Sequence, residues 1–302
     1  MFLNQINSLE VAKVKFELDV VFDLDFSLCC GQVFRFRKQN DWWYGLSGDK
    51  IFKIRQCNNC LEFEGADAFF VKTFFGLNDN LTKITQCINK DSYIAAAIKK
   101  FEGLRLIRQN PWECLISFIC ATYKNIAAIE QTLVKMSQKY GEARYFDDQT
   151  FWLFPSVEKL AEASVQGLEE CGLGYRAKYV HATAKRVCDE RIDLESFRGL
   201  SYVEAKKRLF EFSGVGLKVA DCVLLFSLGK MEAFPVDVWV KRLLLNHYAD
   251  HLSQDLLERL QSHDSLSNGE YEKLGTFARN YFGSYAGYAQ EYLYHYERSK
   301  KY

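Results

Sequence analysis

Residues 211–243, EFSGVGLKVADCVLLFSLGKMEAFPVDVWVKRL, decide how this chain folds. A helix that ends near Ser213 is followed by the turn Gly-Val-Gly and then by an apolar helix. This pattern predicts a helix-hairpin-helix motif over about residues 203–228. Gly214 and Gly216 let the backbone approach a ligand closely, and the free N–H groups that start the second helix attract an anion such as a DNA phosphate. From the glycine spacing alone, a hairpin that merely reverses the chain is an equally good interpretation.

A lysine stands at an unusual place in this stretch. Lys218 lies in the first turn of the second helix, where the helix dipole disfavours a cation and apolar neighbours add a desolvation cost. Both effects favour the neutral amine, a nucleophile that can form a Schiff base with a sugar carbon. Asp237 follows where a helix N-cap is expected, so its carboxylate stays ionised and can stabilise a developing cation. The structural alternatives are a lysine that extends to solvent and an aspartate that only caps a helix.

The first 65 residues alternate polar and apolar side chains, which is typical of half-buried antiparallel strands. Groups of turn-forming residues separate the alternating segments. The predicted strands cover residues 13–20, 22–26, 32–37, 41–46, 50–55 and 60–65. We therefore expect a small twisted sheet at the start of the chain.

Beyond this sheet the apolar residues recur three and four positions apart, which predicts helices. One helix has a clear start, because Asn110 can cap it, Pro111 suits its first position and Glu113 follows three after the cap. From there to the C-terminus the sequence predicts helices only. The expected fold class is α+β, with an antiparallel sheet domain and flanking helices over residues 1–95 and a larger all-α body over residues 96–302.

Composition excludes several classes of protein. The 302 residues carry a formal net charge of zero, which argues against a protein that coats nucleic acid by bulk electrostatics. Residues 172–192 hold five basic and two acidic side chains, a local charge of plus three that suits either a phosphate contact or a solvated helix face. No apolar run is long enough for a membrane helix, and the first 20 residues mix in charge too early for a secretory signal.

The ten cysteines lack the dense, even spacing of a small secreted scaffold and fit a reducing compartment. The single CxxC, from Cys57 to Cys60, has no second pair at metal-ligand spacing, so we expect no metal site there. No iron-sulfur cysteine set is visible either.

Five stretches together resemble a known family. They are CGQVFRFR from residue 30, NPWECLISFIC from 110, GLGYRAKYV from 172, the hairpin block, and YAGYAQEYLY from 285. In this order they are similar to the helix-hairpin-helix, Gly/Pro-Asp superfamily of base-excision DNA glycosylases, and within it to 8-oxoguanine DNA glycosylases. The resemblance covers most of the chain. It implies an enzyme that flips 8-oxoguanine out of duplex DNA, excises it through a lysine Schiff base and then nicks the strand by β-elimination.

The resemblance also implies roles for single residues. Lys218 displaces the base at the sugar C1′ atom, and Asp237 stabilises the oxocarbenium-like transition state. The implied base pocket consists of Gly31, Cys222, Gln290 and Tyr294. In it, a carbonyl at Gly31 accepts the N7 hydrogen that 8-oxoguanine has and guanine lacks. Cys222 lies against the base, Gln290 binds its Watson–Crick edge and Tyr294 stacks on it. The implied DNA wedge and backbone contacts are Tyr175, Arg176, Gly214, Gly216 and Trp239.

This chain departs from the family pattern in two places. In the region implied to face the opposite base, which contains Asn125, Tyr123 replaces an asparagine and Ala128 replaces an arginine. Because donors that would bind cytosine are missing, we predict weak discrimination of the opposite base. Trp239 stands where a histidine is common near a backbone phosphate, which puts that contact in doubt.

The implied partner is double-stranded DNA containing 8-oxoguanine, bound by a monomer without membrane contact. We expect no cofactor and no catalytic metal, apart from a cation that can bridge the hairpin carbonyls and a phosphate. The expected compartment is the cytoplasm or nucleoid of a prokaryote, or the nucleus of a eukaryote. Two alternatives stay open: a glycosylase for another oxidised or alkylated base, and a noncatalytic DNA-binding module. The latter would not require Lys218, Asp237 and Cys222 together.

Overall fold

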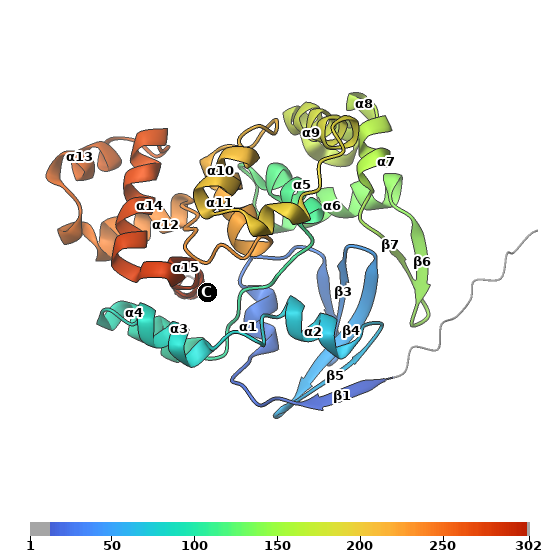
Figure 1. Ribbon diagram of the computed structural model, residues 1–302, viewed down its shortest axis with the longest axis horizontal. Coiled ribbons are helices and arrows are strands. Elements are labelled where there is room, and N and C mark those ends of the chain that lie inside the picture. Colours follow the sequence, from blue (N-terminus) through green and yellow to red (C-terminus); the bar gives the residue numbers. More distant parts are fainter. Residues whose placement is uncertain (1–12, 301–302) are drawn as a thin grey trace, which may run out of the picture.

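The computed structural model describes residues 13–300. The N-terminal segment that the sequence analysis does not identify as a secretory signal has its first twelve residues outside this range. A five-stranded antiparallel sheet forms the N-terminal part, in the order β1-β5-β4-β3-β2 (Figure 1). The strands are β1 (Val14–Glu17), β2 (Phe36–Gln39), β3 (Trp42–Ser47), β4 (Lys50–Cys57) and β5 (Cys60–Glu64). The predicted antiparallel sheet is confirmed.

One face of this sheet is buried because side chains alternate along each strand. Phe52 and Ile54 of β4 point to that face and are fully buried, together with Phe63 of β5. Helix α2 (Ala68–Phe74) covers them, and the rings of Phe52 and Phe74 lie edge to face at 5.9 Å. The sheet therefore has its own apolar core, separate from the core of the helical part.

The strand predicted at residues 22–26 is wrong, because helix α1 (Leu24–Cys29) begins there. Asp23 caps α1 by accepting a backbone N–H one turn later at 2.7 Å. In a helix the four-residue spacing of Leu24 and Leu28 places both side chains in the core of the sheet domain. Five alternating residues were too few to tell the two patterns apart.

The strand predicted at residues 32–37 begins later, at Phe36. The side chain of Gln32 is buried and donates to the backbone carbonyls of Ser27 and Arg105, each at 2.8 Å. Such bonds hold the segment around Gly31 in an irregular conformation in place of a strand.

The expectation of helices only after residue 110 is wrong at one place. Strands β6 (Ala143–Phe146) and β7 (Gln149–Trp152) form a hairpin with a two-residue turn. Asp147 and Asp148 occupy the turn at φ of 50° and 56°, which suits the twist of a tight hairpin. The Asp147 carboxylate also accepts from Lys53 of β4 at 2.8 Å, so this hairpin extends the helical body toward the sheet.

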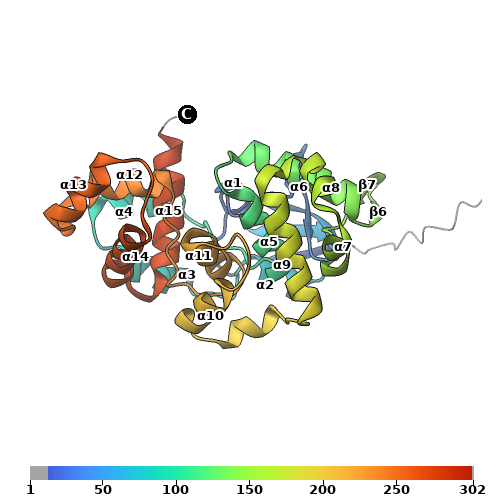
Figure 2. The same ribbon diagram turned by 90° about the horizontal axis from the view of Figure 1, so that it is seen from above.

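The rest of the chain is helical. The helices are α3 (Leu81–Ile88), α4 (Ser92–Lys100), α5 (Pro111–Ala121), α6 (Ile126–Tyr140), α7 (Val157–Glu162), α8 (Val165–Leu168), α9 (Ala177–Asp189), α10 (Tyr202–Leu209), α11 (Leu217–Phe226), α12 (Val238–His247), α13 (Gln254–Ser262), α14 (Asn268–Phe282) and α15 (Ala286–Ser299). Helices α12–α15 form one group with α3 and α4, and α5–α9 form another beside the sheet, with α11 between them (Figures 1 and 2). Among residues 13–300, no helix is long and apolar enough to cross a membrane.

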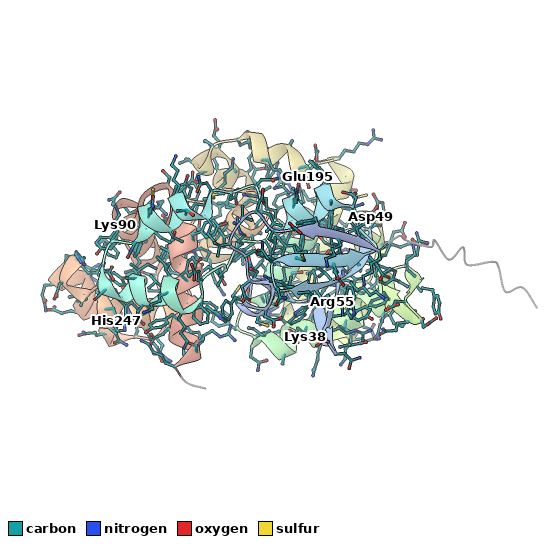
Figure 3. All side chains as sticks on the ribbon, turned by 90° about the horizontal axis from the view of Figure 1, so that it is seen from below. Lys38, Asp49, Arg55, Lys90, Glu195 and His247 are labelled. Carbon is teal, nitrogen blue, oxygen red and sulfur yellow. The ribbon has the colours of Figure 1, made fainter. Side chains whose placement is uncertain are left out.

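Helices α3 and α4 follow the sheet in sequence but pack against α15. Seen from below, Lys90 and His247 lie at the end of the molecule opposite to Lys38 and Arg55 of the sheet (Figure 3). The domain boundary predicted after residue 95 falls inside α4 and stays a prediction.

Helix α5 begins as predicted and ties the two parts together. Asn110 accepts the N–H of Glu113 at 3.1 Å, with Pro111 at the first position. The Glu113 carboxylate does not close a capping box. It accepts from the Arg35 guanidinium at 3.0 Å and from the Gly48 N–H at 2.9 Å, so a buried ion pair joins α5 to the sheet domain.

Candidate active site

The helix-hairpin-helix motif is present as predicted, from α10 to α11. The first helix ends at Leu209, before Ser213, and irregular turns lead to Gly214. Gly214 has φ of 80°, and a Cβ atom there would lie 2.8 Å from the Cβ of Tyr179, so only glycine fits. Gly216 precedes α11, and no side chain of residues 13–300 caps that helix end. The N–H groups at the start of α11 are therefore available to an anion.

Lys218 and Cys222 lie four residues apart on α11, which places them on one face of the helix. Lys218 is half-buried and Cys222 is buried. Burial raises the pKa of the Cys222 thiol to about 12. The charge of Lys218 opposes this rise, whereas the carboxylates of Asp221, Asp237 and Glu291 add to it. The thiol is thus neutral near pH 7. Lys218, the predicted nucleophile, and Asp237, its predicted electrostatic partner, both shift the pKa of this thiol.

Asp237 is the N-cap of α12, as the sequence predicted, and accepts the N–H of Val240 at 2.9 Å. A second set of bonds fixes the backbone just before it. The N–H of Val236 donates to the Tyr271 hydroxyl at 3.2 Å, and this hydroxyl donates to the fully buried Asp221 carboxylate at 2.8 Å. Because Asp221 directly precedes Cys222 on α11, one buried carboxylate holds both α11 and the segment that carries Asp237.

Two segments far apart in the sequence supply three of the predicted base-pocket residues. Gly31 follows α1, and a Cβ atom added there would lie 3.5 Å from the Tyr294 ring of α15. Burial raises the pKa of the Tyr294 hydroxyl, and the Asp237 carboxylate adds to this rise. Gln290, one turn before Tyr294, is buried, and its Oε1 atom has no hydrogen-bond partner among the described residues. The structure thus places Gly31 against Tyr294, near the N-terminus of α12.

The predicted wedge, Tyr175, is an exposed aromatic residue on the turn that precedes α9, and 49% of its surface is accessible. Arg176 is buried, and the DNA contact implied for it stays a prediction. Its guanidinium lies 4.4 Å from the centre of the Tyr175 ring, and its Nε atom donates to the Thr122 carbonyl at 2.9 Å. Arg176 therefore braces the wedge against the region of Tyr123. Trp239 lies half-buried in the first turn of α12.

Tyr123 is the most exposed large hydrophobic residue of the described chain, at 89%. Its backbone is left-handed, with φ of 53°. Both neighbours are fixed: Thr122 accepts from Arg176, and Lys124 donates to the Gly172 carbonyl at 2.7 Å. The ring of Tyr123 is thus held out from an anchored loop.

The other residues of the region implied to face the opposite base are part of helix α6. The Asn125 side-chain oxygen accepts the N–H of Ala128 at 2.9 Å, so it acts as the α6 cap. Ala128 lies half-buried in the first turn of that helix.

Sequence reasoning missed two residues around Gly31. Glu291 of α15 is buried between the predicted pocket residues Gln290 and Tyr294. The guanidinium of Arg298, one turn beyond Tyr294, lies 5.2 Å from the centre of the Tyr294 ring. Arg298 also donates to the Cys30 carbonyl at 3.3 Å. The sequence YAGYAQEYLY contained a signal for Glu291. An acidic residue among aromatic residues that are expected to be buried is costly, which indicates a structural or functional role.

Within residues 13–300, no three His, Cys, Asp or Glu side chains are grouped so that they could hold a metal ion. Cys57 and Cys60 are free thiols that face each other across the β4–β5 turn. The expectation of a chemistry without a cofactor stays a prediction.

The comparisons with known proteins agree with this geometry. Residues 13–115 match the family described as 8-oxoguanine DNA glycosylase, N-terminal domain, and residues 116–262 match the HhH-GPD superfamily of base excision DNA repair proteins. The chain is 33% identical over 229 residues to the probable N-glycosylase/DNA lyase of Methanothermobacter thermautotrophicus, an alignment that covers 69% of this chain and 68% of that protein. The chain belongs to the 8-oxoguanine DNA glycosylase family. It is therefore an enzyme of base excision DNA repair.

Other family members support this membership. The N-glycosylase/DNA lyase of Saccharomyces cerevisiae is 32% identical over 64% of this chain, and the alignment spans just over half of the yeast protein, 56%. The apo-form of the Clostridium acetobutylicum 8-oxoguanine glycosylase/lyase is 30% identical with a TM-score of 0.84, and the match covers 94% of this chain and 96% of that one. The predicted family and the two-part α+β fold are confirmed, whereas the roles of single residues stay predictions.

Proposed function

We propose that this protein excises 8-oxoguanine from duplex DNA with Lys218 as the nucleophile and then nicks the strand. The observation that carries the proposal is the placement of Lys218 at the uncapped start of α11, one turn before the buried Cys222 thiol, whose pKa responds to both Lys218 and Asp237. The names of its relatives support the same pair of activities, because they are called N-glycosylase/DNA lyase and 8-oxoguanine glycosylase/lyase.

The chemistry begins at the sugar C1′ atom. As the bond from C1′ to the base breaks, the sugar gains positive charge, which the Asp237 carboxylate stabilises. The bonding electrons leave with the base, and the amine of Lys218 forms a bond to C1′. One amine proton goes to the departing base and the other to the ring oxygen O4′ as the bond from C1′ to O4′ breaks, so a Schiff base results. Loss of a C2′ proton then expels the 3′ phosphate, and water releases the lysine.

The base is selected by the pocket at Gly31 and Tyr294. A carbonyl of Gly31 accepts the N7 hydrogen of 8-oxoguanine and repels the bare N7 acceptor of guanine. The flipped base stacks on the Tyr294 ring with Cys222 on its other face. The unpaired and buried Oε1 atom of Gln290 supports its part in this proposal, because it can accept an N–H from the Watson–Crick edge.

The DNA partner is a duplex that contains the lesion, bound by one copy of the chain. The Clostridium acetobutylicum enzyme has been solved with double-stranded DNA containing cytosine opposite 8-oxoG, and its structure matches this one with a TM-score of 0.83 at 30% identity. In the proposed complex Tyr175 enters the helix beside the flipped nucleotide. The backbone at Gly214 and Gly216 meets a phosphate, with Trp239 and a bridging cation as further contacts.

The opposite base is recognised weakly in this proposal. Tyr123 offers an exposed aromatic face in place of the family asparagine, and Ala128 offers no donor in place of the arginine. An aromatic face stacks on every base, whereas hydrogen-bond donors distinguish them. The enzyme is therefore expected to excise 8-oxoguanine at similar rates whichever base lies opposite.

The test is covalent trapping. The pure protein is mixed with an 8-oxoguanine:cytosine duplex and sodium borohydride, and the products are separated on a denaturing gel, with Lys218→Gln as the control. We expect an adduct with the wild type alone. Release of the base without an adduct would replace the lysine with water as the nucleophile. If the base stays in place, the same assay with other oxidised and alkylated bases decides between a different glycosylase and a noncatalytic binding module.

A further inference from the structure

Glu291 is a buried acid that the proposed chemistry does not use. Only 2% of its surface is accessible, and its Oε1 atom has no hydrogen-bond partner among the described residues. A buried carboxyl group with a free oxygen is costly and calls for a structural or functional reason. Its place on α15, directly after Gln290 and three residues before Tyr294, sets it beside the proposed base pocket.

The carboxyl group of Glu291 lies against the residue that precedes Gly31. It lies close enough to the Cys30 thiol for each group to shift the pKa of the other, and this thiol donates to the Ser27 carbonyl at 3.4 Å and accepts from the Gln32 side chain at 3.3 Å. Arg298 donates to the Cys30 carbonyl at 3.3 Å. Two side chains of α15, separated by about two helical turns, thus lie against the Cys30–Gly31 segment, with Glu291 beside the Cys30 thiol and Arg298 bonded to the Cys30 carbonyl.

Gly31 depends on this support because it has little of its own. Its φ of 104° lies in the region that favours glycine, and it has no side chain to anchor the peptide. Recognition of the N7 hydrogen requires its carbonyl oxygen at a defined hydrogen-bond distance. A small displacement of Cys30 therefore reaches the carbonyl that separates 8-oxoguanine from guanine.

The protonation state of Glu291 is finely balanced. Burial raises its pKa to about 7, the nearby Cys30 thiol and the charge of Arg298 oppose this rise, and the Asp237 carboxylate adds to it. Besides these three residues, Tyr294 on α15 and Cys222 on α11 carry the titratable groups that face it. When the carboxyl group ionises, Arg298 is the one cation of this set, and it is already bonded to Cys30.

We propose that Glu291 is a positioning residue for lesion recognition: its uncharged form keeps the Cys30–Gly31 segment in place, and its ionised form draws Arg298 away from the Cys30 carbonyl. Discrimination between 8-oxoguanine and guanine then weakens as the pH rises past neutrality. This inference rests on the proposed function, because it assumes that the Gly31 carbonyl contacts the base.

The experiment measures the Kd of the full chain for a duplex with 8-oxoguanine and for the same duplex with guanine, at pH values from 6 to 9. For the wild type we expect the ratio of the two constants to fall about fivefold over this range. Glu291→Gln, which stays uncharged, keeps the low-pH ratio throughout. Glu297→Gln is the matched control on the same helix, because Glu297 pairs with Lys300 and Tyr93 away from the pocket, and it retains the wild-type profile.

A wild-type pH profile in Glu291→Gln would overturn the proposal. If that variant does not fold, Arg298→Gln supplies the test. In the proposal Arg298 is the group that ionised Glu291 draws from the Cys30 carbonyl, so its loss removes the fall in the ratio between pH 6 and 9, and a fall like that of the wild type would contradict the proposal. If the wild type prefers 8-oxoguanine at no pH, the proposed substrate fails instead, which separates the two claims.

Discussion

Two regions proposed to meet the same DNA are built in opposite ways. Around Cys222 and Asp237, buried groups bond one another. Beside Arg176, Tyr123 and Tyr175 are exposed, and Tyr123 stands where the family resemblance implies an asparagine. This contrast indicates that bond breaking requires fixed geometry, whereas filling a gap in the DNA stack requires only an exposed aromatic side chain.

The largest expected effect concerns the fixed region. Asp237→Asn should lower the rate of base excision about 10²–10³-fold, because it removes the charge that stabilises the developing cation. An asparagine also caps helices well, so the melting temperature should change little. Single-turnover excision and thermal unfolding measure both quantities. A rate within threefold of the wild type would show that Asp237 only caps α12.

A second expected effect concerns the free energy of unfolding, which depends on the protonation of the buried Glu291. The pKa of Glu291 is raised from its ordinary value of 4.5 to about 7, so folding takes up a proton. Its contribution to stability is complete below pH 4.5 and is lost as the pH rises to 7, by about 3 kcal/mol. Urea unfolding of the wild type and Glu291→Gln should therefore diverge over this window. Parallel curves would mean that the carboxyl group reaches water.

The exposed region should respond more weakly. Tyr123→Ala should weaken binding of the lesion duplex about tenfold, since one stacked base contributes about 1–3 kcal/mol. The loss should be similar with each of the four opposite bases. Tyr123→Phe, which keeps the ring, is the matched control and should bind as the wild type does. A loss confined to cytosine would instead indicate recognition by hydrogen bonds.

The smallest effect is expected from a substitution that restores a family residue in the exposed region. Ala128→Arg should raise the preference for cytosine over the other opposite bases about fivefold, because an arginine restores hydrogen-bond donors in the first turn of α6. Excision rates from four duplexes measure this ratio. A strong cytosine preference in the unaltered protein would refute the account of Tyr123 and Ala128.

The sequence predicted the parts that depend on local rules. The Gly-Val-Gly hairpin, the cap at Asp237 and the start of α5 at Asn110 each follow from a few neighbouring residues, and all three are confirmed. The alternation at residues 22–26 predicts a strand, and this prediction is wrong because five residues fit either a strand or a helix. The hairpin at residues 143–152 was missed because a turn of two aspartates lacks the usual glycine.

The surroundings of the site were beyond reach of the sequence for a different reason. Cys30 meets Glu291 across about 260 residues of chain, and Arg176 reaches Thr122 from another helix. No periodicity encodes such pairs, since they depend on how α15 packs beside α1 and how α9 packs beside α5. The resemblance implies a DNA contact for Arg176, but its burial beside the Tyr175 ring depends on packing that the sequence does not show.

The proposed role of Lys218 as the nucleophile can be tested directly. The borohydride-reduced complex with an 8-oxoguanine duplex can be digested with a protease and a nuclease, and mass spectrometry of the peptides then locates the remaining sugar. We predict that the modification lies on the peptide spanning Gly216 to Cys222, at Lys218. A modification at another lysine, or at none while the base is still released, would contradict the account.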